Sequence, residues 1–187
     1  MATALGKHAQ MDFDELALKA EDLDLEGDLT VGDDATITGD LLVTGSTTLS
    51  GTVSGKALTE VVTAANIITA AESGSVFFLS SATEFASTLP AAAAGLRFTF
   101  IVTAAPSGAD YTITTDSSAN IIKGQAYTLD VNSATDPDFE VTGCDTISFV
   151  SAKAVAGDRV DVICDGTNWF AYGFSSVFDA ITFTTAS

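Results

Sequence analysis

Apolar residues recur every six positions between Leu23 and Val53 of this chain. One column of the repeat is entirely aliphatic and consists of Leu25, Val31, Ile37, Val43 and Leu49. Two residues further along each hexad lies a turn-like column, in which Asp33 is the one position that is not glycine. A short fixed period with alternating apolar positions and regularly placed glycines predicts an array of short β-strands of the β-solenoid kind.

The repeat is too short to fold as a single chain. A left-handed single-chain β-helix takes about three hexads per turn, and about three stacked units are needed to bury a core. The repeat makes fewer than about two such turns, so we expect identical chains to wind together around a shared apolar axis. Residues 23–55 are therefore predicted to form an intertwined β-stalk in a homotrimer. Its core would be the aliphatic column Leu25, Val31, Ile37, Val43 and Leu49.

The hydrophobic pattern changes after Gly55. Residues 56–74 contain few turn signals and predict a linker that passes into a first strand. In residues 75–187, apolar positions alternate within short runs that are separated by clusters of Gly, Asn, Ser and Asp, as is typical of strands and turns. The runs that predict strands are Ser75–Leu79, Leu96–Thr103, Tyr111–Thr115, Ala126–Val131, Thr146–Val150, Arg159–Cys164 and Trp169–Phe174.

The dipeptide Asp165–Gly166 between the last two runs is a strong hairpin signal. Trp169 and Tyr172 in the second of these runs are candidates for stacking on a sugar ring, the alternative being that they pack in the core. Many short strands at near-regular spacing predict a β-sandwich or jelly-roll-like head over residues 75–187. The expected fold is therefore all-β, with a short N-terminal arm, a hexad-repeat stalk and a C-terminal head.

Residues 1–22 form the predicted arm. Phe13, Leu16 and Ala20 are at helical spacing, and acidic residues occupy the first turn, where the helix dipole favours them. One interpretation is a short amphipathic anchor that docks on a partner through these three apolar residues. The other is a frayed terminus with a chance pattern.

The chain is strongly acidic, with 25 Asp and Glu against 7 Lys and Arg and a formal net charge of -18. Binding to nucleic acid or to an anionic membrane requires a basic patch, so this composition argues against both kinds of partner. A large net charge keeps a repetitively displayed protein soluble, and an acidic surface also suits saline surroundings. The sequence has no signal-peptide core and no apolar run long enough to span a membrane, which predicts synthesis in a cytoplasm.

No motif predicts a catalytic residue, a bound cofactor or a metal centre. His8 is the only histidine and lies in the arm, away from the expected framework. Cys144 and Cys164 lie in or beside predicted strands without His neighbours, which fails the ligand count of a zinc site. Buried thiols are expected, with a disulfide between the two as the alternative.

Carboxylates are numerous enough for coincidental clusters. Asp136, Asp138 and Glu140, and also Asp33 and Asp34, have the oxygen ligands that Ca²⁺ takes, but the EF-hand pattern is absent. Solvated loop acids are the simpler interpretation. A glycosidase needs two carboxylates across a sugar cleft, and the sequence singles out no such pair.

The stretch GDLTVGDDATITGDLLVTGSTTLSGTVSG resembles the repetitive stalks of tailed-bacteriophage fibres and virion structural proteins, whose similar units wind into trimeric β-rods. The runs TLPAAAAGLRFTFIV and GDRVDVICDGTNWFAYG resemble the globular β-domains that often follow such stalks. Together the two resemblances cover residues 23 to about 174. They imply a non-enzymatic, homotrimeric component of a virion.

The resemblance does not determine where on the virus particle the protein is located. Host-binding tail fibres are usually much longer and carry a large N-terminal adaptor domain. A short arm, a short stalk and one head better suit a capsid decoration protein or short head fibre. Such a protein would sit on the capsid surface, attached by its arm to the major capsid protein or another virion protein. The alternatives are a short tail or baseplate fibre that binds a host-surface glycan, and a glycan-cleaving domain.

Overall fold

β-Strands and one short 3₁₀ helix, η1, are the only regular elements in residues 30–45, 47–48, 56–81, 83–129 and 139–185, the part of the chain that this computed structural model describes. The all-β prediction is confirmed. The chain divides into two units, Met1–Thr52 and Val53–Ser187. All the strands belong to the second unit, the head, and are β1 (Thr59–Val62), β2 (Asn66–Ile67), β3 (Val76–Leu79), β4 (Phe85–Thr88), β5 (Arg97–Val102), β6 (Tyr111–Thr114), β7 (Ile122–Thr128), β8 (Phe139–Cys144), β9 (Thr146–Phe149), β10 (Arg159–Cys164), β11 (Trp169–Ser175) and β12 (Ile181–Thr184).

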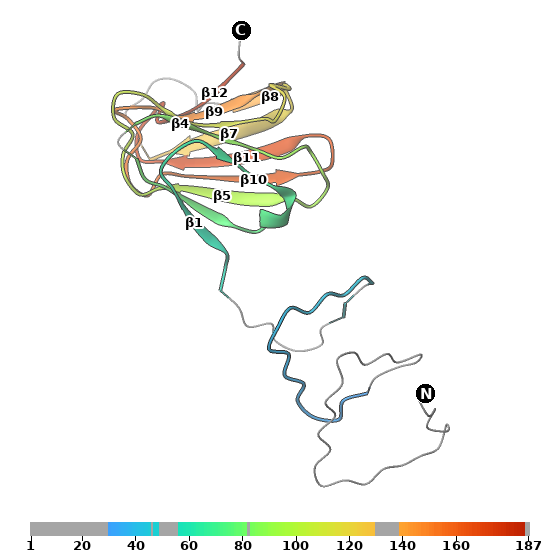
Figure 1. The fold of residues 1–187 in the computed structure, drawn as a ribbon. Coiled ribbons are helices and arrows are strands. Elements are labelled where there is room, and N and C mark those ends of the chain that lie inside the picture. The colour runs from blue at the N-terminus through green and yellow to red at the C-terminus, as the bar shows by residue number, and fades with distance from the viewer. Residues whose placement is uncertain (1–29, 46, 49–55, 82, 130–138, 186–187) are drawn as a thin grey trace, which may run out of the picture. The chain divides into compact units, whose positions relative to one another are not determined.

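The strands form two mixed sheets. The large sheet has the order β1-β3-β5-β10-β11-β7-β8, and the small sheet has the order β12-β9-β6-β4-β2 (Figure 1). From β1 to β6 the chain alternates between the two sheets, and each new strand pairs in parallel with the previous strand of its own sheet. The first part of the head therefore winds in successive coils. The later strands β9, β10 and β12 close the sheets through antiparallel pairs.

This pairing differs from the expected jelly-roll-like arrangement, because jelly rolls are built from antiparallel strands. Here β7 also pairs in parallel with β11, although it pairs antiparallel with β8. The alternating hydrophobic pattern marks a half-buried strand in either case, so it does not reveal the direction of the partner. The parallel pairs do not fit the jelly-roll detail of the prediction, whereas two sheets packed on one core are compatible with its coarser β-sandwich form.

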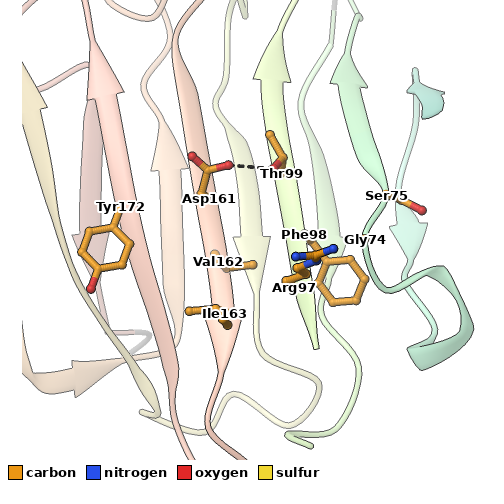
Figure 2. A pocket seen from close by; sticks show the side chains of 9 residues that line it. All are labelled: Gly74, Ser75, Arg97, Phe98, Thr99, Asp161, Val162, Ile163 and Tyr172. Atoms are coloured by element: carbon orange, nitrogen blue, oxygen red, sulfur yellow. Dashed lines mark hydrogen bonds between the residues drawn. The ribbon is translucent and has the colours of Figure 1, made fainter. Parts of the chain in front are cut away.

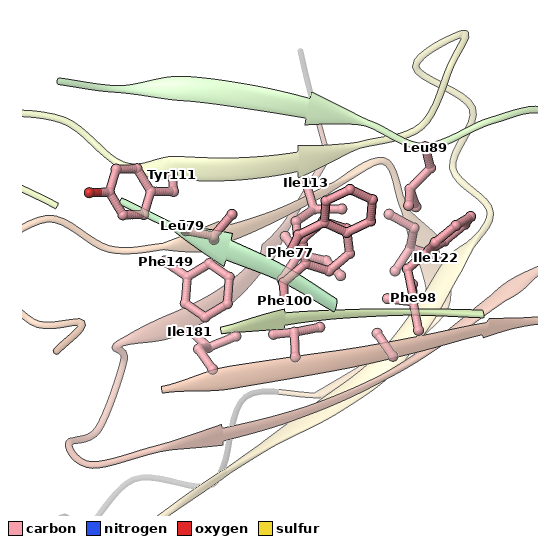
Figure 3. Packing of buried hydrophobic residues seen from close by; sticks show 14 of the residues in the cluster. Phe77, Leu79, Leu89, Phe98, Phe100, Tyr111, Ile113, Ile122, Phe149 and Ile181 are labelled. Carbon is pink, nitrogen blue, oxygen red and sulfur yellow. The ribbon is translucent and has the colours of Figure 1, made fainter. Parts of the chain in front are cut away.

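The core lies between the inward faces of the two sheets (Figure 3). Phe77, Phe98 and Phe100 come from β3 and β5 of the large sheet and are almost fully buried, with the rings of Phe77 and Phe100 stacked at 5.3 Å between centroids. Tyr111 of the small sheet is fully buried, and its hydroxyl lies 2.9 Å from the carbonyl oxygen of Ala104. Each buried large side chain stabilises the fold by about 1.5–3 kcal/mol relative to exposure.

The segment expected to hold a linker and a first strand contains two strands. Residues 56–74 include β1, β2 and the 3₁₀ helix η1 (Ala70–Glu72). A capping box begins η1: Glu72 accepts hydrogen bonds from the backbone N–H and the hydroxyl of Thr69. The first coil of the head thus starts at Thr59, within the segment where a first strand was expected.

The predicted stalk is described only in part. Residues 30–45 and 47–48 contain no strand in the single chain, and Val31, Ile37 and Val43 expose 48%, 54% and 47% of their surface. Leu25 and Leu49 lie outside the described residues, as does the whole arm with His8, Phe13, Leu16 and Ala20. The trimeric β-stalk stays a prediction.

Candidate functional site

Cross-strand register arranges the outward side chains of the large sheet in three rows. The apolar row consists of Val61, Phe78, Ile101, Arg159, Phe174 and Tyr127. The polar row consists of Thr59, Val76, Thr99, Asp161, Tyr172 and Gln125. The basic row consists of Arg97, Ile163, Phe170 and Lys123. These rows exist because alternate residues of a strand point to opposite faces, and the inward set fills the core.

A groove of about 340 Å³ opens between the polar row and the basic row. Figure 2 shows its lining, which comes from β5, β10 and β11 and from the segment just before β3. The outward-facing side chains that line it are those of Arg97, Thr99, Asp161, Ile163 and Tyr172, with Gly74 and Ser75 from the segment before β3. The groove therefore combines an aromatic ring, an aliphatic side chain, a guanidinium and a carboxylate.

The carboxylate of Asp161 is bound by the side chains of Thr99 and Arg159. The hydroxyl of Thr99 donates a hydrogen bond of 2.6 Å to Oδ1 of Asp161. Nε of Arg159 donates a hydrogen bond of 2.8 Å to Oδ2, and Nη2 of Arg159 lies 2.6 Å from the same oxygen. The geometry fixes the carboxylate and neutralises the charge of Arg159. Arg97, by contrast, forms no ion pair with any residue in the described part of the chain.

The two candidates for stacking on a sugar ring differ in their exposure to solvent. Trp169 is fully buried, so the suggestion that it contacts a glycan is wrong, whereas Tyr172 exposes 44% of its surface. The reason is the two-residue period of a strand, which places residues three positions apart on opposite faces. Trp169 packs in the core against Phe98, with ring centroids 5.8 Å apart. Its indole N–H is buried and has no hydrogen-bond partner within the described residues.

The predicted hairpin is confirmed. Its two strands, β10 and β11, both contribute residues to the groove. β10 and β11 pair antiparallel from Cys164 opposite Trp169. In the connecting turn, Oδ1 of Asp165 accepts hydrogen bonds from the backbone N–H of Asn168 (2.7 Å) and Thr167 (2.8 Å). These two bonds hold the pKa of the Asp165 carboxyl below its ordinary value of 3.8.

The residues that line the groove include none of the remaining chemical candidates. Cys144 and Cys164 are buried thiols, as expected. Asp33 and Asp34 are exposed, while Asp136, Asp138 and the Glu140 side chain lie outside what the structure describes. Among the described residues, no group of three or more His, Cys, Asp or Glu could hold a metal ion, and no helix is long and apolar enough to span a membrane.

Known proteins do not identify the chain. No protein-family model matches it, and neither a curated protein nor a solved structure matches it. The functional argument therefore rests on the chemistry of the chain's own residues.

Sequence reasoning singled out Tyr172 but missed its partners in the groove. The alternation in Leu96–Thr103 already places Arg97, Thr99 and Ile101 on one face, and the alternation in Arg159–Cys164 does the same for Asp161. What the sequence did not provide was the pairing of β5 with β10, which are far apart along the chain. The apolar row was missed for the same reason.

Proposed function

We propose that this chain is a structural protein of a virion, most consistent with a homotrimeric capsid decoration protein or short head fibre. The hexad segment forms the trimeric stalk, and the head is displayed outward from the capsid surface. Residues 1–22 are the anchor, which docks Phe13, Leu16 and Ala20 on the major capsid protein or another virion protein. The role is non-enzymatic and needs no cofactor.

The observation that carries this proposal is the exposure of the aliphatic column. Val31, Ile37 and Val43 each expose about half of their surface in the single chain. Burying a side chain of this size completely is worth about 1.5–3 kcal/mol, so the remaining half is worth about 1 kcal/mol for each residue in each chain. In a trimer with one shared apolar axis, each of the three chains gains this burial free energy.

The charges of the same segment fit this geometry. Asp33, Asp34 and Asp40 are exposed and alternate with the aliphatic column. In a trimer whose axis is apolar, these carboxylates face water, where like charges on neighbouring chains are separated and screened. An interface built on the acidic positions would instead bring like charges together.

Purified particles of the virus that encodes the chain test the proposal. A decoration protein is present in hundreds of copies, whereas a tail or baseplate fibre is present in a few tens or fewer. Quantitative mass spectrometry against the major capsid protein gives the number. Deleting residues 1–22 should leave the protein folded and trimeric but absent from particles. The proposal is contradicted if particles lack the full-length protein, or if the truncated protein still decorates them fully.

A second candidate function, saccharide binding by the head, is favoured by the groove beside Tyr172. An exposed aromatic ring next to a free guanidinium and a fixed carboxylate can stack on a sugar and hydrogen-bond its hydroxyls. Nuclear magnetic resonance titration with N-acetylglucosamine and galacturonate oligosaccharides tests it. Binding should shift the amide signals of Arg97 and Tyr172, and Tyr172→Ala should abolish the shifts while Tyr127→Ala retains them. Unchanged spectra with both probes would exclude these two sugars.

A further inference from the structure

The apolar row crosses six strands of the large sheet with one charged member. Val61 exposes 63% of its surface, Phe174 52% and Tyr127 48%. The rings of Tyr127 and Phe174 stack with 5.8 Å between centroids, and Phe78 and Ile101 are partly buried between them and Val61 along the row. The charge of Arg159 is neutralised by Asp161. The exposed parts of Val61, Phe174 and Tyr127 are apolar surface that contact with a partner would remove from water.

Charge complementarity indicates what that partner surface is like. After residue 55 the chain has 14 Asp and Glu against 5 Lys and Arg. Arg97 and Lys123 project from this face in addition to Arg159, whose charge Asp161 neutralises. On the rest of the described surface after residue 55, the basic side chains are Lys56 and Lys153, and the acidic side chains that are not buried are Glu60, Glu72, Glu84, Asp110, Asp116, Asp165 and Asp179. That surface is therefore acidic. A face that is apolar and basic is complementary to an acidic surface of another head. Contacts between two different surfaces of identical subunits can close a ring of three.

The size of the face indicates how such contacts are maintained. Strands spaced about 4.8 Å apart, with outward residues about 7 Å apart along each strand, give the three rows together a face of about 500 Å². A stable interface of standard size buries about 800 Å² on each partner. The face alone is too small to hold two free heads together. A stalk that joins the chains raises the effective concentration of the heads to about the millimolar range, where a weak contact forms.

We infer that the outer face of the large sheet, centred on Phe174 and Tyr127, is the surface by which each head packs against the next copy of this chain. The inference rests on the proposed trimer and extends it, because it adds contacts between heads to those within the stalk. It also predicts that head contacts depend on the stalk.

Hydroxyl-radical footprinting of the full-length chain tests the inference, with light scattering on the same samples to report the number of chains. The variants Ile37→Asp and Val43→Asp each disrupt the stalk without touching the head. We expect oxidation of Tyr127 and Phe174 to be several-fold lower in the wild type than in either variant. Ile67 is the internal control, because it is 80% exposed and lies on β2 of the other sheet, and its oxidation should be equal in all samples.

Footprinting and light scattering together distinguish failure of the proposed trimer from failure of the proposed contact between heads. If the wild type is trimeric and the variants are monomeric, but Tyr127 and Phe174 are oxidised equally, the face is open in the trimer and the inference is wrong while the stalk remains supported. If the wild type itself is monomeric, the proposed trimer fails and the inference fails with it. Protection of Ile67 without protection of Tyr127 and Phe174 would place the contact on another surface and would also overturn the inference.

Discussion

At the scale of single residues, the turn between β10 and β11 depends on one carboxylate. Asp165 accepts two backbone hydrogen bonds from Thr167 and Asn168, and Gly166 adopts a φ of 105°, which favours glycine. The ionised carboxylate is the stronger acceptor, so the folded state favours the charged form. This is why the pKa of Asp165 lies below 3.8.

The depressed pKa predicts how the turn responds to acid. A carboxyl whose pKa is lowered by folding contributes stability that is fully present above its unfolded value and is lost as the pH falls through the folded value. We therefore expect the carboxyl of Asp165 to titrate below pH 3.8 in a carbon-13 NMR titration. The amide signals of Thr167 and Asn168 should shift with the same midpoint. In Asp165→Asn the acceptor remains without the charge, so these amide signals should no longer titrate at that midpoint. A midpoint at or above 3.8 would contradict the account of the turn.

At the scale of elements, strands with strong alternation were predictable and their partners were not. β10 has the bounds expected from the sequence, and β5 and β9 each end within a residue of theirs. β7 begins at Ile122, four residues before the expected start, because Lys123 to Gln125 include a glycine that weakens the strand signal. One strand was expected in residues 56–74, without bounds, where the structure has β1 and β2. The strands β4, β8 and β12 were not predicted, since each is short or lacks clear alternation. The groove could be found only once β5, β10 and β11 were known to be neighbours.

Gly124 explains why a residue with weak strand propensity lies within β7. It is opposite Ala171 in the parallel pair of β7 and β11. A Cβ at this position would overlap the carbonyl oxygen of Ala171, which belongs to the backbone and cannot move aside by itself. The close approach of the two strands therefore requires glycine.

The substitution Gly124→Ala should destabilise the head by about 1–3 kcal/mol, the usual cost of adding a methyl group where there is no space. Urea unfolding followed by tryptophan fluorescence reports this, because Trp169 begins the neighbouring strand β11. Gly39→Ala is the matched control: nothing lies within 4 Å of the added Cβ at that position. The control should leave the unfolding midpoint of the head unchanged. Equal midpoints for both variants would show that the strands tolerate the added group.

At the scale of the whole molecule, we propose that copies of the same chain cover two exposed apolar surfaces. The hexad column exposes Val31, Ile37 and Val43, and the head exposes the apolar row around Phe174. The net charge of -18 opposes association in general, so each contact must combine apolar burial with a favourable placement of charge. The proposed stalk turns its carboxylates outward, and the proposed contact face of the head carries Arg97 and Lys123. In this proposal the N-terminal arm is available for anchoring the trimer.

The most direct test of this account is the mass of the full-length protein in solution, measured by light scattering after size-exclusion chromatography. The account predicts three times the chain mass of 19.1 kDa for the wild type. Ile37→Asp, which would bury three like charges at one level of the axis, should give the mass of a single chain. Thr38→Asp adds the same charge at the neighbouring exposed position and should remain trimeric. A wild type with the mass of one chain, or a trimer that survives Ile37→Asp, would contradict the account.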